Sequence, residues 1–214
     1  MSIITGCNSY STSAGKDGEC GAQRHIDSNG IKIIRLPRPK FIPAYLHYGK
    51  IRYYSVLPAV LEEENPDIVF LHGIQTFSLI PLSRYAKKHP NVCFYADIHA
   101  DDFNTSKSFV GRRLLHGIVY AGLYKMFGGF FTKLFYVTPE RRDFLISDYG
   151  LDEKKYKMEF LPLGGISYPD EKYKEIRESE RRKLGLRDGD VAFVHSGKLE
   201  PRKHTLDDIK AFID

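Results

Sequence analysis

A basic turn near the C-terminus carries residue types suited to binding an anion. An apolar run leads into Gly197, and the cations Lys198, Arg202 and Lys203 follow before a helix-like segment at 205–213. Glycine allows a backbone to approach a ligand closely, and a helix N-terminus beside cations attracts negative charge. The turn therefore predicts a site for a diphosphate, while a solvated basic turn explains the same residues.

Histidines follow two other apolar runs of the sequence. His99 comes directly after residues 92–98, and His72, with Gly73 next to it, comes directly after residues 68–71. Ligands of open parallel sheets bind at the carboxyl ends of the strands. A histidine at a strand end is more often structural when taken alone, and Gly73 also fits a simple turn. We nevertheless treat these three residues as candidates for a cleft.

Other kinds of chemistry have less support in the residues. His99, Asp101 and Asp102 could bind a divalent ion, and Mg²⁺ or Mn²⁺ would prefer the carboxylate oxygens among these donors. The sequence has no Ser/His/Asp nucleophile pattern, no Gly-x4-Gly-Lys phosphate loop and no Gly-x-Gly-x-x-Gly after a strand.

The elements that must position these residues alternate along the chain. Short runs rich in β-branched or aromatic residues predict strands at 2–5, 31–36, 68–71, 92–98, 134–137, 158–161 and 191–194. Longer segments with helical spacing predict helices at 44–64, 78–88, 106–127, 139–149, 170–184 and 205–213. This order is typical of the α/β class, with a parallel sheet and helices on both of its faces.

The sequence also predicts the organisation of the chain. Residues 7–30 are rich in Ser, Gly, Asn and Asp, which predicts a long mobile loop. A Pro-Leu-Gly-Gly turn after residue 161 predicts a boundary, with one domain at 1–165 and the start of another at 166–214. We expect the first domain to lack its first βα unit and the second to be truncated after one strand and one helix.

Composition sets broad limits on the function. The 214 residues are 42% hydrophobic, enough for a substantial core, and carry a formal net charge of +5. The three cysteines have no metal-ligand spacing, and a reducing cytosol is the simpler inference. Basic charge alone would suit nucleic acid, but no recognition motif accompanies it, so we expect no nucleic-acid partner.

The basic turn resembles a known motif. Ser196-Gly-Lys-Leu-Glu-Pro-Arg-Lys is similar to the Gly-Arg-Leu…Lys motif that opens the donor domain of family-four retaining glycosyltransferases. Lys198 stands at the position of the motif's Arg, and Lys203 at that of its Lys. His204 replaces the Gly usual after that Lys. Lysine cannot make the planar, bidentate contact that arginine makes with phosphate. Lys198 therefore departs from the family pattern in its phosphate-binding chemistry.

Two further segments resemble the same family. Pro66-Asp-Ile-Val-Phe-Leu-His-Gly is similar to its Pro-Asp-(apolar run)-His strand. Phe135-Tyr-Val-Thr-Pro-Glu-Arg-Arg-Asp-Phe-Leu, followed by Phe160-Leu-Pro-Leu-Gly, looks like its passage to an Ile-Pro-Asn-Gly interdomain turn, with Leu163 at the Asn position. The resemblance covers roughly residues 66–214.

The resemblance implies the GT-B arrangement of two facing Rossmann-like domains and a hexosyltransferase-type enzyme. A nucleotide sugar is then the co-substrate, with no further cofactor and no metal. Gly197, Lys198 and Lys203 would bind the donor diphosphate, His99 would contact the transferred sugar, and Arg202 would lie near the cleft. The anomeric configuration would be retained, and the departing phosphate could itself take the acceptor proton.

The resemblance also implies partners and a place of action. The acceptor would be a glycan or a lipid-linked glycan, as in polysaccharide or glycolipid synthesis, and the protein would be cytoplasmic, at the inner face of the membrane. Residues 106–135 mix cations with apolar side chains, which suits peripheral membrane contact. A core-packing helix with its charges in water is the other interpretation of this segment.

Two rival functions remain at this point. One is a GT-B sugar-nucleotide epimerase, and the other is a non-catalytic Rossmann-like binding module. Because the resemblance places further donor-binding residues after residue 214 and a Gly-rich loop before residue 1, we expect this chain by itself to be inactive or severely impaired.

Overall fold

The computed structural model describes residues 1–6, 8–10, 17–19, 23–43, 46–99, 110–162, 164, 165, 167–194 and 204–213. The chain divides into two compact units, Met1–Leu163 and Gly164–Asp214. The domain boundary predicted from the sequence falls between residues 165 and 166.

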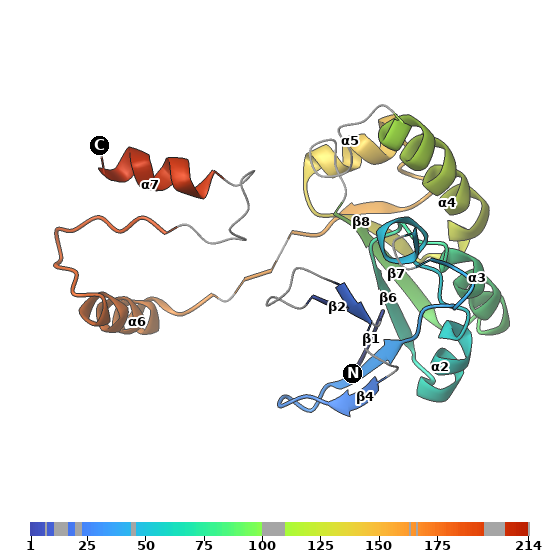
Figure 1. Ribbon diagram of the computed structural model, residues 1–214, viewed down its shortest axis with the longest axis horizontal. Helices are drawn as coiled ribbons and strands as arrows, with labels where there is room; N and C mark the ends of the chain where they lie inside the picture. Colours follow the sequence, from blue (N-terminus) through green and yellow to red (C-terminus); the bar gives the residue numbers. More distant parts are fainter. Residues whose placement is uncertain are drawn as a thin grey trace. The chain divides into compact units, whose positions relative to one another are not determined.

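A four-stranded sheet forms the centre of the first unit (Figure 1). Its strands lie in the order β6-β7-β8-β9, and every neighbouring pair is parallel. The bounds are β6 (Ile68–His72), β7 (Cys93–Ile98), β8 (Lys133–Tyr136) and β9 (Met158–Phe160). Parallel neighbours need crossover connections, and helices supply them here. The predicted α/β class and parallel sheet are therefore confirmed for this part of the chain.

The N-terminal strands form a second, mixed sheet. Strand β1 (Ser2–Gly6) pairs in parallel with β5 (Lys32–Leu36), and β4 (Gln23–Ile26) pairs antiparallel with the other side of β5. Glu64, at the end of a helix, ties this sheet down by accepting a hydrogen bond from Ser2 at 2.6 Å and pairing with Lys32.

The predicted loop at 7–30 was partly wrong. It contains β4 and also the short antiparallel pair β2 (Asn8–Tyr10) and β3 (Asp17–Glu19). The polar residues of β4 suit an exposed edge strand, whose stability comes from pairing with β5 and from the bidentate contact of Arg24 with Glu63. Local composition does not reveal such a long-range partner.

The predicted helix at 44–64 is in fact two helices in its described part. A π-helical turn, η1 (His47–Ile51), precedes α2 (Leu57–Glu64). Arg52 between them adopts a left-handed conformation, with φ of 48°. This conformation ends the first helix, and Pro58 in the first turn of α2 starts the next.

The second long predicted helix, at 106–127, also differs. Residues 101–109 lie outside the described part, and from there η2 (Val110–Tyr120) is π-helical before α4 (Ala121–Phe127) and the 3₁₀ turn η3 (Gly128–Phe130). The helices α3 (Leu79–Lys88) and α5 (Pro139–Ser147) lie close to their predicted bounds. The hydroxyl of Thr138, however, accepts a hydrogen bond from Arg141 and does not cap α5.

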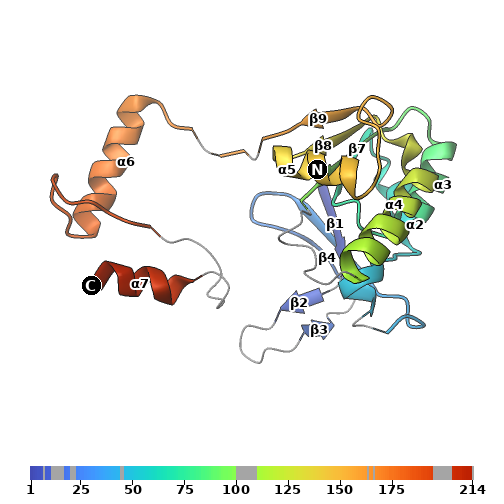
Figure 2. The same cartoon turned by 90° about the horizontal axis from the view of Figure 1, so that it is seen from above.

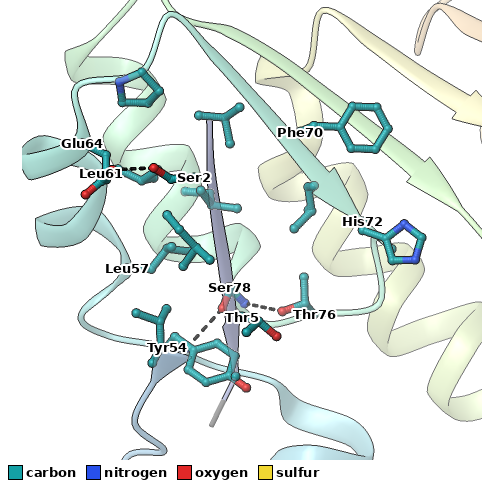
Figure 3. Close-up of a pocket in the computed structure, with 18 of the residues that line it drawn as sticks. Ser2, Thr5, Tyr54, Leu57, Leu61, Glu64, Phe70, His72, Thr76 and Ser78 are labelled. Atoms are coloured by element: carbon teal, nitrogen blue, oxygen red, sulfur yellow. Dashed lines mark hydrogen bonds between the residues drawn. The ribbon is translucent and has the colours of Figure 1, made fainter. Parts of the chain in front are cut away.

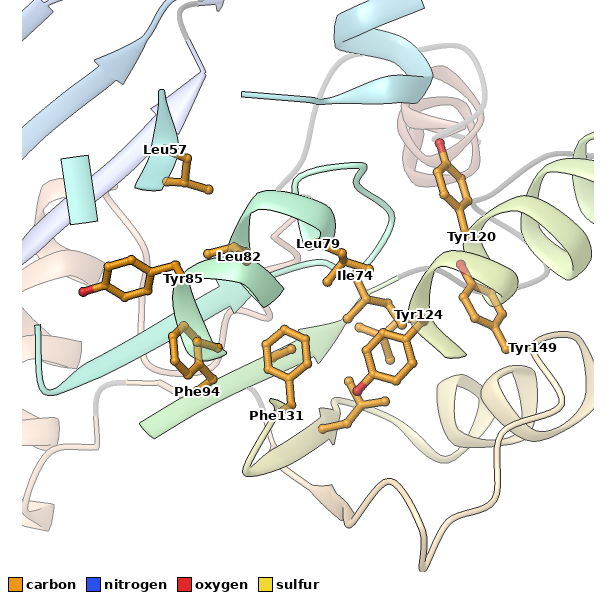
Figure 4. Close-up of a cluster of buried hydrophobic side chains, with 14 of the residues drawn as sticks. Leu57, Ile74, Leu79, Leu82, Tyr85, Phe94, Tyr120, Tyr124, Phe131 and Tyr149 are labelled. Carbon is orange, nitrogen blue, oxygen red and sulfur yellow. The ribbon is translucent and has the colours of Figure 1, made fainter. Parts of the chain in front are cut away.

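One hydrophobic core joins these helices to the four-stranded sheet. Figures 1 and 2 show α2, α3 and α4 on the same side of this sheet, and Figure 4 shows the side chains between them. Phe94, Ala96 and Leu134, which share one face of the sheet, are almost completely buried there. Tyr124 of α4 lies stacked on Phe131 with ring centres 5.9 Å apart. This packing fixes the strands whose ends carry the candidate site.

The second unit consists of α6 (Asp170–Lys183), α7 (Thr205–Ile213) and connecting segments. The predicted strand at 191–194 was wrong, because these residues are extended but unpaired and Val191, Phe193 and Val194 are each more than 70% exposed. A strand needs a neighbour to satisfy its backbone groups, and the described residues of this unit contain no other strand.

Candidate functional site

Two histidines meet one buried carboxylate at the carboxyl ends of β6 and β7. His72 and Asp97 are direct partners in the register of these strands, and His99 follows β7 by one residue. Nδ1 of His72 and Nε2 of His99 each lie 3.0 Å from Oδ2 of Asp97. The two rings are 4.4 Å apart between centres. We call His72, Asp97 and His99 the histidine cluster.

A glycine turn holds the other side of the carboxylate. The backbone N–H of Gly73 donates a hydrogen bond to Oδ1 of Asp97 at 2.9 Å. Gly73 has φ of 86°, in the left-handed region that favours glycine. The turn that the sequence indicated at Gly73 is therefore real, and it also orients Asp97. Both oxygens of this carboxylate are held by neighbouring groups.

Exposure increases outward through the histidine cluster. The side chain of Asp97 is 7% exposed, that of His99 34% and that of His72 74%. The carboxylate is thus shielded from water while the two imidazoles are accessible. A ligand approaching the strand ends would meet imidazole nitrogen atoms first.

A groove runs from the histidine cluster along β6. It has a volume of about 800 Å³ and lies between β6, β1 and α2 (Figure 3). Strands β1 and β6 belong to different sheets of the described structure and make no ladder with each other. The backbone groups along these two edges are therefore not hydrogen-bonded across the groove. Leu57, Leu61 and Val69 supply apolar walls, and His72 and Gly73 lie at the polar end.

A hydrogen-bonded loop shapes the polar end of the groove. The hydroxyls of Thr76 and Ser78 both donate to the backbone carbonyl of Arg52, at 2.6 and 2.9 Å. The hydroxyl of Thr76 also accepts a bond from the backbone N–H of Ser78 at 3.1 Å. The loop after β6 is thereby fixed to the segment between η1 and α2, and sequence reasoning missed both hydroxyls.

A buried amide lies next to this loop. Gln75 is only 9% exposed. Burial raises the pKa of Tyr149, and a hydrogen bond from the side chain of Gln75 has a smaller, opposing effect on it. Oε1 of Gln75 lies 3.5 Å from where a side chain at Gly73 would begin.

An aromatic row continues from the histidine cluster across the sheet. Phe70, Tyr95 and Phe135 lie on the face of the sheet that also bears His72 and Asp97. The ring of Phe135 stacks against those of Phe70 and Tyr95, at 6.2 and 5.9 Å between centres. Figure 3 shows Phe70 and His72 projecting from the same side of β6. This face offers flat apolar surface beside polar groups.

A third histidine has a different, structural environment. His116 of η2 is 5% exposed, and its Nδ1 lies 3.1 Å from the hydroxyl of Tyr149. Burial lowers the pKa of His116 to about 4, with a smaller lowering by Arg52 and an opposing effect of Asp148. Burial also raises the pKa of Tyr149. This imidazole is therefore neutral at physiological pH and belongs to the core.

The surface of η2 and α4 bears directly on the predicted membrane contact. Leu114 and Ile118 are 53% and 62% exposed, and Arg113 and Lys125 are exposed near them in sequence. The opposite side of these helices packs into the core through Tyr120. The core-packing interpretation therefore holds for the buried side of these helices, and membrane contact stays a prediction. No helix among the described residues has the length and apolar character needed to span a bilayer.

The predicted donor site cannot be placed against the histidine cluster. Gly197, Lys198, Arg202 and Lys203 lie outside the described residues, as do Asp101 and Asp102. His204 is described and has φ of 54°, and its Nδ1 lies 2.9 Å from a carboxylate oxygen of Asp207 in α7. The structure brings together His99, His72 and Gly73 and adds Asp97 to them.

Asp97 is the residue of this site that sequence reasoning missed. A signal for it exists, because Asp97 is the polar residue near the end of the predicted strand at 92–98 and His72 directly follows the preceding predicted strand at 68–71. Parallel pairing of such strands brings their carboxyl ends together. The two-residue offset between Asp97 and His99 becomes meaningful only once the register is known.

The sheet and the site define a class of protein. It is a mixed α/β protein whose four-stranded parallel sheet, flanked by helices, is compatible with a Rossmann-like fold and carries polar groups at its strand ends. No protein-family model matches the chain, and no curated protein matches it either. The family assignment therefore remains a resemblance.

Proposed function

We propose that the chain is part of a retaining glycosyltransferase that moves a sugar from a nucleoside diphosphate to a hydroxyl acceptor. The observation that carries the proposal is the pair of accessible imidazoles held on Asp97 at the ends of adjacent parallel strands. Ligands bind at such strand ends. Imidazole nitrogens can donate to or accept from sugar hydroxyls.

The carboxylate gives His99 a defined orientation. With Nε2 directed at Asp97, Nδ1 of His99 remains available to a donor sugar. The proposed transfer needs no dedicated base, because the departing phosphate can take the acceptor proton.

The proposed diphosphate contacts are Gly197, Lys198 and Lys203. Preorganised cations at this position would stabilise the negative charge that builds up on the leaving group. One described neighbour supports the resemblance, since His204 adopts the left-handed conformation that favours the glycine usual at this motif position. The two-domain GT-B arrangement belongs to the same proposal.

In this proposal a further strand of the fold occupies the groove between β1 and β6. The unpaired edges of both strands face this groove. A strand running parallel to both would join the two sheets into one. The membrane-facing role of η2 and α4, with a glycan or lipid-linked acceptor, is likewise part of the proposal.

The test is an assay of a length-restored protein against the present chain. Flanking coding sequence would supply both ends, and nucleoside diphosphate release would be measured across UDP- and GDP-sugars with glycan acceptors. We expect turnover only from the restored protein, and a loss of about 10²–10³-fold in kcat for Lys198→Ala or Lys203→Ala. His25→Ala, at an exposed position of β4, is the control.

Three outcomes would count against the proposal. Equal turnover by the present chain and the longer protein would show that the added flanking segments are not needed for transfer. A hydrolysis and epimerisation product formed without acceptor would favour the epimerase. Nucleotide-sugar binding by the restored protein without any turnover would favour the binding module.

A further inference from the structure

The histidine cluster has the donor atoms of a transition-metal site. Nδ1 of His72, Oδ2 of Asp97 and Nε2 of His99 all lie within 4.8 Å of one another. It is the one such group of three among the residues whose placement is described. We propose that this cluster binds a zinc ion through these three atoms, leaving a further coordination position open.

Two of the three separations between donor atoms are close to those around tetrahedral zinc, and the third, between the two imidazole nitrogens, is within 4.8 Å. Metal–ligand bonds of about 2.0–2.1 Å at tetrahedral angles place neighbouring ligand atoms about 3.3 Å apart. Two of the three separations in the cluster are 3.0 Å. The remaining adjustment falls on the ring of His72, whose side chain is 74% exposed and therefore able to rotate.

The charge of the cluster favours a cation. Asp97 is a carboxylate with 7% exposure, and its ion-pairing partners in the described part of the chain are the two imidazoles. Buried carboxylates are normally paired with a charge or coordinate a metal. Zinc binds imidazole in its neutral form, and a bound divalent cation would then supply the positive charge that pairs with the carboxylate.

The surroundings have the features of a metal site with an open position. The N–H of Gly73 holds Oδ1 of Asp97 at 2.9 Å, which is the outer hydrogen bond that orients a ligating carboxylate. The outer side of the cluster faces solvent through His72. Three protein ligands with one accessible position are the usual arrangement where zinc binds a water or a substrate.

The donor types select the metal. Two nitrogen donors argue against Mg²⁺ and Ca²⁺, which take oxygen ligands, and favour zinc-class ions. The resemblance implies an enzyme without a metal, and the divalent-ion site considered from the sequence used His99 with Asp101 and Asp102. The present inference uses Asp97 and does not depend on glycosyl transfer, because its readout is metal binding.

The test is titration of the untagged, EDTA-treated chain with Zn²⁺ by calorimetry, and with Co²⁺ by visible absorption. We expect one ion per chain and the intense absorption bands of tetrahedral Co²⁺. His72→Gln, His99→Gln and Asp97→Asn should each weaken binding by at least about tenfold. Zn²⁺ should also raise the thermal midpoint of the unsubstituted chain and not that of these variants.

A matched control comes from another imidazole–carboxylate pair. Nε2 of His89 lies 2.8 Å from Glu62, without a third donor among the described residues. His89→Gln should leave the affinity unchanged. Absence of saturable binding, or equal affinity in the double variant His72→Gln/His99→Gln, would overturn the proposal. Because His72 is exposed, its variant keeps the test valid if Asp97→Asn does not fold.

Discussion

The buried imidazole of His116 should make the first unit sensitive to mild acid. Its pKa is lowered from 6.5 to about 4 in the folded state, chiefly by burial. Below pH 6.5 the unfolded chain takes up a proton that the folded chain refuses, so the free energy of unfolding falls as the pH falls. The contribution is fully present above pH 6.5 and is lost progressively down to about pH 4.

The magnitude follows from the pKa of His116 in the folded and unfolded states. Each tenfold difference in proton affinity between the two states corresponds to about 1.4 kcal/mol, and the difference in proton uptake between pH 7 and pH 5 gives about 2 kcal/mol. Small domains have unfolding free energies of about 5–15 kcal/mol. A loss of about 2 kcal/mol from this one side chain would therefore be a substantial part of the total stability of such a domain.

The variant His116→Gln isolates the effect. Glutamine is polar but does not titrate, and it retains a group able to bond to the hydroxyl of Tyr149. Urea unfolding would be measured at pH 7, 6 and 5 for both proteins. We expect the unsubstituted chain to lose about 2 kcal/mol more than the variant between pH 7 and pH 5. The variant's own packing cost cancels, because only the change with pH is compared.

Two results would refute this reasoning. Parallel stability curves for the two proteins would show that His116 does not carry the proton linkage. An NMR titration of the His116 ring with a midpoint near 6.5 in the folded state would show that its burial has no electrostatic consequence. His25→Gln, at an exposed position, should keep the pH dependence of the unsubstituted chain.

Three further predictions concern glycines and the surface of η2. Gly6→Ala should lower the free energy of unfolding by about 1–3 kcal/mol, because the new methyl group would overlap the phenol of Tyr54. Unchanged urea unfolding would contradict this prediction. Gly73→Ala should lower the free energy of unfolding by about 1–3 kcal/mol, because Gly73 has a positive φ. Gly122→Ala, in open space on α4, should raise the free energy of unfolding by up to about 1 kcal/mol. Equal effects of the two substitutions would show that backbone conformation is not the cause. The double variant Leu114→Ser/Ile118→Ser should partition to phosphatidylglycerol vesicles at least about tenfold more weakly, because both side chains are exposed and apolar. Partitioning would be measured by sedimentation, with neutral phosphatidylcholine vesicles as the control. Unchanged partitioning would show that these two residues take no part in membrane contact.

The alternation of elements was determined by local sequence. Six of the seven predicted strands are present, because short runs rich in β-branched or aromatic residues and bounded by turns favour strands locally. The helices α3, α5, α6 and α7 also lie near their predicted bounds, since hydrophobic spacing and end signals act within a few residues. The candidates His72, Gly73 and His99 came from the same local rule about strand ends.

Tertiary structure decided what depends on distant partners. The polar strand β4 exists because β5 lies beside it, and the apolar run at 191–194 is no strand because the described part of its unit offers no neighbour. The left-handed conformation at Arg52 ends one helix, and the backbone carbonyl of this residue anchors the loop that lines the groove. The sequence predicted one continuous helix here, because the segments on both sides of Arg52 have helical spacing. The convergence of His72 and His99 on Asp97 follows from the register of β6 and β7. That register is set by backbone pairing between residues 25 apart in sequence, and no local sequence pattern specifies it.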